Sequence, residues 1–154
     1  MTDVTLQPAV EQARLIREGK LGAVELLEGH LARYERHNPA LNAIIFTQVD
    51  KAMARAREAD KAMAKGEVWG PLHGLSMTIK DSYDWVGAPS TWGIPEMAEN
   101  YPERDSVAVR RLEKAGAIIY GKTNIPLLLA DWQSFNDIYG TTNNPWDLAL
   151  TPGG

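Results

Sequence analysis

Residues 70–87, Gly-Pro-Leu-His-Gly-Leu-Ser-Met-Thr-Ile-Lys-Asp-Ser-Tyr-Asp-Trp-Val-Gly, are the stretch from which the fold can be predicted. Turn-forming residues open it, and apolar and polar side chains then alternate from Leu75 to Lys80. A period of two predicts a β-strand whose opposite faces are Leu75, Met77, Ile79 and Ser76, Thr78, Lys80. Lys80 therefore ends a strand, on the same face as two hydroxyl groups. For the strand alone, an ordinary solvated lysine is the simplest interpretation.

The length and composition are those of one globular domain, and they exclude several kinds of site. The chain has 154 residues, of which 44% are hydrophobic and 23% charged, with a net charge of −4. Without a basic run, neither nucleic acid nor an anionic membrane is expected as a direct partner. The chain has no cysteine and its three histidines do not cluster with carboxylates, so no metal site is predicted. We find no secretion signal or membrane-spanning run, and we expect a cytoplasmic protein.

Helical and extended patterns alternate along the chain. Apolar spacing predicts helices over residues 6–18, 23–37, 49–65 and 106–115, a helical segment over 125–130, and strands over 42–47, 75–80 and 117–120. We expect Pro39 to end the second helix, Arg55 to face water on the third, and Asp105 to cap the fourth. Residues 85–102 read as a long irregular segment, of the kind that often wraps a site. The alternation predicts an α/β domain.

Three blocks of sequence together resemble the amidase signature family. They are Gly70–Gly74 with Thr78–Asp81, residues 106–124 with Gly121-Lys122-Thr123-Asn124, and residues 139–147 leading to Pro152-Gly153-Gly154. The resemblance covers nearly the whole chain. It implies that residues 1–154 are the N-terminal portion of a single amidase signature domain, in which a mixed twisted sheet is flanked by helices.

The resemblance also implies a Ser–cis-Ser–Lys hydrolase that cleaves linear amides through an acyl-enzyme, without a metal or an organic cofactor. In such enzymes a lysine is the base, one serine relays the proton and a second serine attacks the carbonyl. Only the lysine can be carried over, onto Lys80. The family places its relay serine directly after Pro-Gly-Gly and its nucleophile further on, so residues 1–154 alone are expected to be inactive.

Two further groups of residues carry open alternatives. Lys122 lies in a Gly-Lys-Thr sequence, but without a phosphate-binding loop before it we favour a structural role that ties a strand to its neighbouring loops. Trp132, Gln133 and Ser134 follow an apolar segment and either line the substrate pocket or serve as core and loop-capping residues.

The resemblance leaves the reaction partners open. The favoured function is an amidase acting on a small-molecule amide. The alternatives are an amidotransferase A-type subunit, which releases ammonia for a partner enzyme, and a non-catalytic assembly module. The strands over 75–80 and 117–120 are expected to lack neighbours, and open strand edges pair with other chains. We therefore expect a homo-oligomer, or a complex with the downstream part of the same protein.

Overall fold

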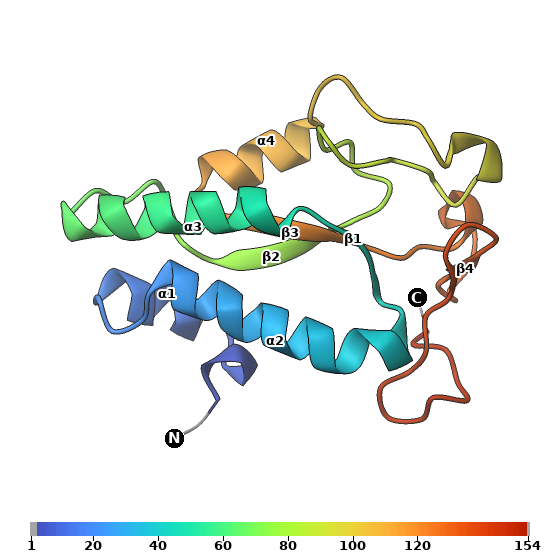
Figure 1. Cartoon of the computed structure of the whole chain (residues 1–154), viewed down its shortest axis with the longest axis horizontal. Coiled ribbons are helices and arrows are strands. Elements are labelled where there is room, and N and C mark those ends of the chain that lie inside the picture. Colours follow the sequence, from blue (N-terminus) through green and yellow to red (C-terminus); the bar gives the residue numbers. More distant parts are fainter. Residues whose placement is uncertain (1–2, 154) are drawn as a thin grey trace.

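The computed structural model describes residues 3–153, and it has a small mixed sheet with helices packed around it (Figure 1). Gly154, the last residue of the Pro-Gly-Gly match, lies outside the described residues. The elements in chain order are η1 (Val4–Leu6), α1 (Ala9–Arg17), α2 (Ala23–Leu41), β1 (Ile44–Thr47), α3 (Val49–Ala64), β2 (Ser76–Lys80), η2 (Pro95–Met97), α4 (Val107–Lys114), β3 (Ile118–Thr123), η3 (Leu127–Leu129), β4 (Phe135–Asn136) and β5 (Gly140–Thr141). The α/β class and the mixed sheet predicted from the sequence are confirmed.

The main sheet has the strand order β1-β3-β2. β2 runs parallel to β3, with Lys80 opposite Thr123, whereas β1 runs antiparallel to β3. The expectation that the strand over 117–120 lacks neighbours is wrong, because β3 is the central strand and is paired on both sides. Within residues 3–153, β2 has a neighbour on one side, so the prediction of an open edge stays for this strand.

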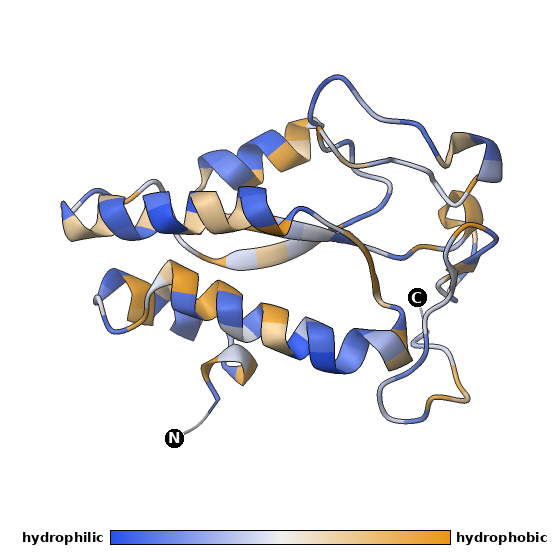
Figure 2. Cartoon of the chain, in the orientation of Figure 1, coloured by the Kyte–Doolittle hydropathy of each residue, from blue (hydrophilic) through white to orange (hydrophobic). Residues whose placement is uncertain are grey.

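The two faces of the sheet carry separate cores. Ile118 and Tyr120 of β3 pack with small buried residues of α2 and α3, among them Ala23, Ala52 and Ala56. Alanines on α3 let its backbone approach the sheet closely, and Figure 2 shows hydrophobic and hydrophilic residues alternating along this helix. On the other face, Ile119 packs with buried residues of β2, α4 and the segment after β2, which are Ile79, Trp85, Ala88 and Val109. The sheet therefore lies between two apolar layers.

Helix α2 continues past the proline that was predicted to end it. Pro39 lies in its last turn, where few backbone amide bonds remain to be lost. The end is set instead by Asn42, which takes a left-handed φ of 51°, and by Asn38, whose side-chain oxygen accepts hydrogen bonds from the amides of Ala43 and Ile44 at 3.0 and 2.8 Å. The first predicted helix is divided, since Leu6 belongs to η1 and α1 begins at Ala9.

Polar contacts correct two further expectations. Ser106, rather than Asp105, caps α4 by accepting a hydrogen bond from an amide of the first turn, while the carboxylate of Asp105 accepts one from Val86 N at 2.7 Å. Arg55 does not face water alone. Its guanidinium donates to the carbonyl of Ala117 at 2.9 Å and lies 4.9 Å from the ring of Trp69, so it ties α3 to the chain before β3.

The segment after β3 is less helical than its apolar sequence predicted. Residues 125–130 contain a single 3-10 turn, η3, in which Leu128 and Leu129 have φ values of 54° and 58°. These left-handed values are incompatible with a continued α-helix. A short hairpin, β4–β5, follows it, with Phe135 opposite Thr141. No helix over residues 3–153 has both the length and the apolar content needed to cross a membrane.

Candidate active site around Lys80

Lys80 is the last residue of β2, and its side chain is exposed. The residue before it, Ile79, is buried in the core, and the residue after it, Asp81, is completely buried. Backbone bonds fix this strand end, since Asp81 N donates to Thr123 O at 3.0 Å and Tyr83 N donates to Lys80 O at 3.1 Å. The lysine therefore stands on a rigid element while its amine remains accessible.

Lys80 lines a surface hollow that brings together three segments far apart in the sequence. Its other lining residues are Leu129, Ala130, Asp131 and Trp132, which we call the site wall, and Gly153 near the end of the chain. Trp132 is 82% exposed and Leu129 is 37% exposed, so the wall presents apolar surface to solvent beside an amine. Gly153 of the Pro-Gly-Gly match thus reaches the same hollow as the lysine.

The predicted binding residues do not all lie together. Trp132 lines the hollow with Lys80, whereas Gln133 and Ser134 are not among its lining residues. Ser134 is buried, and its carbonyl accepts a hydrogen bond from Thr142 N at 2.8 Å, which ties it to the β4–β5 hairpin. The side-chain oxygen of Gln133 is buried and lacks a hydrogen-bond partner among the described residues. Of the three, the geometry brings only Trp132 beside the lysine.

The surroundings of Lys80 leave its side chain open to solvent. β2 is an edge strand within residues 3–153, and Lys80 at its end is exposed rather than buried between the helical layers. One of the two hydroxyls on the strand, that of Ser76, is hydrogen-bonded to His30 Nδ1 of α2 at 2.7 Å. Asp81 pairs with Lys122 and not with Lys80, because adjacent residues of an extended chain point to opposite sides.

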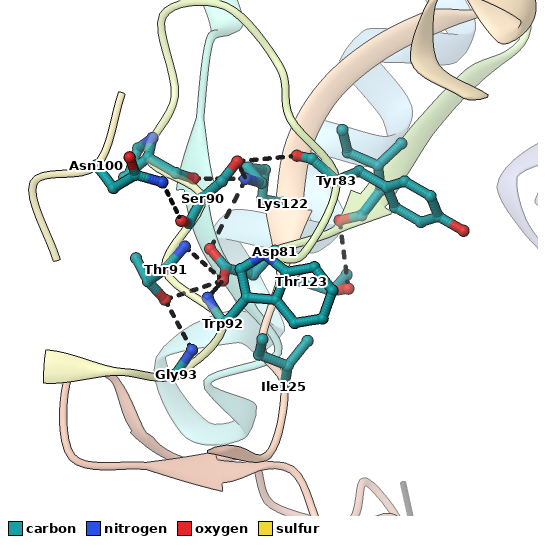
Figure 3. A network of polar contacts seen from close by, with 12 residues as sticks. Asp81, Tyr83, Ser90, Thr91, Trp92, Gly93, Asn100, Lys122, Thr123 and Ile125 are labelled. Atoms are coloured by element: carbon teal, nitrogen blue, oxygen red, sulfur yellow. Dashed lines mark hydrogen bonds and ion pairs between the residues drawn. The ribbon is translucent and has the colours of Figure 1, made fainter. Parts of the chain in front are cut away.

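Sequence reasoning missed the partner of Asp81, which is Lys122 (Figure 3). Both side chains are completely buried, and Lys122 Nζ lies 3.8 Å from Asp81 Oδ1. The same ammonium donates hydrogen bonds to Pro89 O and, at 3.0 Å, to Ser90 Oγ. These bonds tie β3 to the loop over residues 89–93, in agreement with the structural role predicted for Lys122. β2 and β3 are parallel neighbours, so charges at their ends could have suggested the pair.

Burial governs the ionisation of this cluster. It lowers the pKa of Lys122 to about 8, against the opposing pull of the carboxylates of Asp81 and Asp84. Burial, together with the charge of Asp81, raises the pKa of Tyr139 to about 12. A lysine with a lowered pKa is a functional candidate in general, but all of Lys122 is enclosed and its ammonium is already engaged by loop oxygens. The exposed hollow, in contrast, contains Lys80.

Comparison with known proteins gives consistent relatives. The family model described as "Amidase" matches residues 25–154. Indoleacetamide hydrolase of Bradyrhizobium diazoefficiens is 42% identical over 146 residues, which are 95% of this chain and 28% of that protein. The A-type subunit of the glutamyl-tRNA(Gln) amidotransferase of Salinispora tropica is 37% identical over all of this chain and 31% of its own length.

Solved structures agree with the sequence relatives. A fatty acid amide hydrolase structure superposes on all of this chain with a TM-score of 0.93 at 28% identity, covering 28% of its own chain. A bacterial aryl acylamidase, described as a member of the amidase signature enzymes, gives a TM-score of 0.89 at 26% identity over 96% of this chain and 31% of its own. The chain spans about three tenths of the length of the proteins that it matches, and it corresponds to their N-terminal portion. The chain therefore belongs to the amidase family, also called the amidase signature family.

Proposed function

We propose that the intact protein containing this chain hydrolyses linear carboxylic amides through a serine acyl-enzyme, with Lys80 as the base. The observation that carries the proposal is that Lys80 and Gly153 line one hollow. In the family pattern, the relay serine directly follows Pro-Gly-Gly, so the chain would deliver this serine to the lysine's side of the sheet. The site wall lines the same hollow as Lys80 and Gly153.

The proposed reaction conserves its protons. The relay serine takes the proton of the nucleophilic serine and passes its own proton to the neutral Lys80 amine, while the nucleophile's oxygen bonds to the amide carbonyl. When the C–N bond breaks, the leaving amine or ammonia takes up the proton that Lys80 received. Water then cleaves the ester to acid and free serine. Lysine can act here only when neutral, and burial disfavours its charged form. Protein outside residues 3–153 would have to supply that burial.

The site wall indicates which part of a substrate it would contact. Leu129 and Trp132 offer exposed apolar surface next to the lysine. Such a surface favours amides with an apolar or aromatic body, since burying apolar area is favourable. Indoleacetamide hydrolase and fatty acid amide hydrolase, to which the chain is similar, are named for amides of this kind. We keep Trp132 as a proposed substrate-binding residue, whereas the positions of Gln133 and Ser134 favour supporting roles.

The test is to trap the acyl-enzyme. The intact protein is mixed with an arylacetamide and quenched in acid, and its mass is measured. The expected result is a protein heavier by one acyl group on a serine beyond Gly154, which disappears when hydroxylamine is added. Lys80→Met is expected to remove this adduct, whereas Lys61→Met, which changes an exposed lysine of α3, keeps it. Amide turnover without any serine adduct, or an undiminished adduct in Lys80→Met, would contradict the proposal.

A second candidate function is an amidotransferase A-type subunit. It is favoured by the 37% identity with the Salinispora tropica protein over the whole chain. In that case the same acyl-enzyme chemistry would release ammonia for a partner enzyme, and a stable complex is expected. Ammonia release from glutamine that requires added partner subunits would support this function. Robust turnover of arylacetamides without partners would favour the amidase, and inactivity toward both would leave the assembly module.

A further inference from the structure

The buried carboxylate of Asp81 is directed into the loop over residues 89–93 (Figure 3). Its Oδ2 accepts hydrogen bonds from Thr91 N at 3.0 Å, Thr91 Oγ1 at 2.9 Å and Trp92 N at 3.0 Å. Its Oδ1 has no hydrogen-bond partner among the described residues and faces Lys122 Nζ at 3.8 Å. One carboxylate therefore holds the loop with one oxygen and the buried cation with the other.

The loop needs this support because its backbone is strained. Trp92 has a φ of 55°, a left-handed value that is unusual for a bulky side chain. Gly93 follows with a φ of 70°, and its amide donates to Thr91 Oγ1 at 3.0 Å. Strained conformations persist where surrounding contacts hold them. Here the contacts come from Asp81 on one side and from Lys122, which holds the carbonyl of Pro89 and the hydroxyl of Ser90, on the other.

The loop in turn holds the segment that leads into the site wall. The carbonyl of Trp92 accepts a hydrogen bond from Leu128 N at 2.8 Å. Gly93 packs so closely that a Cβ atom there would lie 3.0 Å from the Cα of Leu127. Leu128 and Leu129 both have left-handed φ values, so this turn is also held by its contacts rather than by its own preference. The loop therefore contacts the two residues that lead directly into the site wall.

We propose that Asp81 and Lys122 form a buried clamp that positions the site wall beside Lys80. Asp81 and Lys122 are positioning residues, since neither lines the hollow. The clamp starts one residue after Lys80, at the end of the same strand, so lysine and wall are held by a common element. Two charges serve this role better than one, because the carboxylate can gather three donors from the loop while the cation balances its charge.

Hydrogen–deuterium exchange on the intact protein tests the clamp, read from peptides that cover residues 127–132. Asp81→Asn and Lys122→Met each remove one charge and keep the size of the side chain. Both are expected to speed exchange in these peptides at least about tenfold, the change expected from the loss of one charged hydrogen bond. Arg55→Met is the matched control, since it removes a cation that binds carbonyls before β3 and not in the loop. It should leave the wall's exchange as in the wild type.

The clamp is overturned if wall peptides exchange at the wild-type rate in both charge variants, or no faster than in Arg55→Met. If Lys122→Met does not fold, Asp81→Asn and Thr91→Val decide the question, since Thr91→Val removes a single hydroxyl from the carboxylate. Exchange does not depend on the reaction, so it answers even if no amide is hydrolysed.

The use of the wall by substrate rests on the proposed function and has its own measurement. In the active protein, Asp81→Asn should raise KM for an arylacetamide at least about threefold more than KM for acetamide, because only the larger substrate reaches the wall. An equal change for both amides would overturn the positioning of substrate by the clamp. A general loss of stability would alter the amount of active protein, and it would not separate the two KM values.

Discussion

Lys122→Met is the substitution that most directly probes the interior of this fold. Lys122 is completely buried in β3, where it binds Pro89 O and Ser90 Oγ and faces Asp81 at 3.8 Å. Methionine has a similar length and no charge. The variant therefore keeps the packing of the side chain and removes its polar contacts, leaving Asp81 as a buried carboxylate without its cation.

The cost can be reasoned from the partners left behind. Removing one member of a buried ion pair costs about 3–5 kcal/mol, because the remaining charge stays out of water without compensation. Asp81 keeps three donors from the 89–93 loop, which places the expectation at the lower end, about 3 kcal/mol. The double variant Asp81→Asn/Lys122→Met removes both charges. It should be destabilised by less than the sum of the single variants, since neither charge is stranded.

Urea unfolding, followed by tryptophan fluorescence, measures these free energies. Lys61→Met is the control, because Lys61 is exposed on α3 and a surface substitution of this kind changes stability by less than about 0.5 kcal/mol. The reasoning would be refuted if Lys122→Met lost no more stability than Lys61→Met. It would also be refuted if the double variant lost as much as both single variants added together.

Three other properties of the chain can be predicted from the same structure. Burial lowers the pKa of Lys122 to about 8 from 10.5, so above pH 8 the unfolded chain retains a proton that the folded chain releases, and stability should rise by roughly 2 kcal/mol between pH 8 and 10. Lys122→Met should remove this rise, as measured by urea unfolding at each pH. Above pH 10 the stability of the wild type should fall again, because the pKa of Tyr139 is raised to about 12 in the folded chain and its phenol ionises first in the unfolded chain. Gly116→Ala should lower the free energy of unfolding by roughly 3 kcal/mol, because Gly116 has a φ of 100° and a Cβ there would lie 2.6 Å from His73 Cα. The control Gly66→Ala, at a φ of 76° but in open space, should lower it by only about 1 kcal/mol. Purified residues 1–154 should not hydrolyse arylacetamides, and serine-dependent turnover by this chain would count against our assignment of the missing serines.

The sequence predicted local structure well where periodicity was strong. The strand ending at Lys80 and the helix from Val49 follow from alternation and amphipathicity, which depend on the burial of one face. The ends of elements were predicted less well. Pro39 does not end α2, because Asn38 and Asn42 provide a better end one turn later. Asn42 is also held by a long-range contact that no local pattern contains, since its side-chain amide donates to Tyr139 O at 2.6 Å.

The candidate site was only partly predictable for the same reason. Lys80 could be chosen from its strand position and the family resemblance, whereas Trp132 was left open between lining the substrate pocket and packing in the core. The pairing of Asp81 with Lys122 depends on the register between β2 and β3, which brings together residues far apart in the chain. The loss of helical structure around Leu128 likewise depends on its bond to Trp92.

The role of Lys80 is tested most directly by the rate of acylation in a single turnover of the intact protein. Release of nitroaniline from an arylacetyl nitroanilide would be followed across pH for wild type, Lys80→Arg and the control Lys61→Arg. Arginine keeps the charge but does not release its proton, so Lys80→Arg should acylate at least about a hundredfold more slowly at every pH. Wild type and Lys61→Arg should acylate at the same rate, because Lys61 is exposed on α3 and away from the hollow. A folded Lys80→Arg that acylates at the wild-type rate would contradict the assignment of Lys80 as the base.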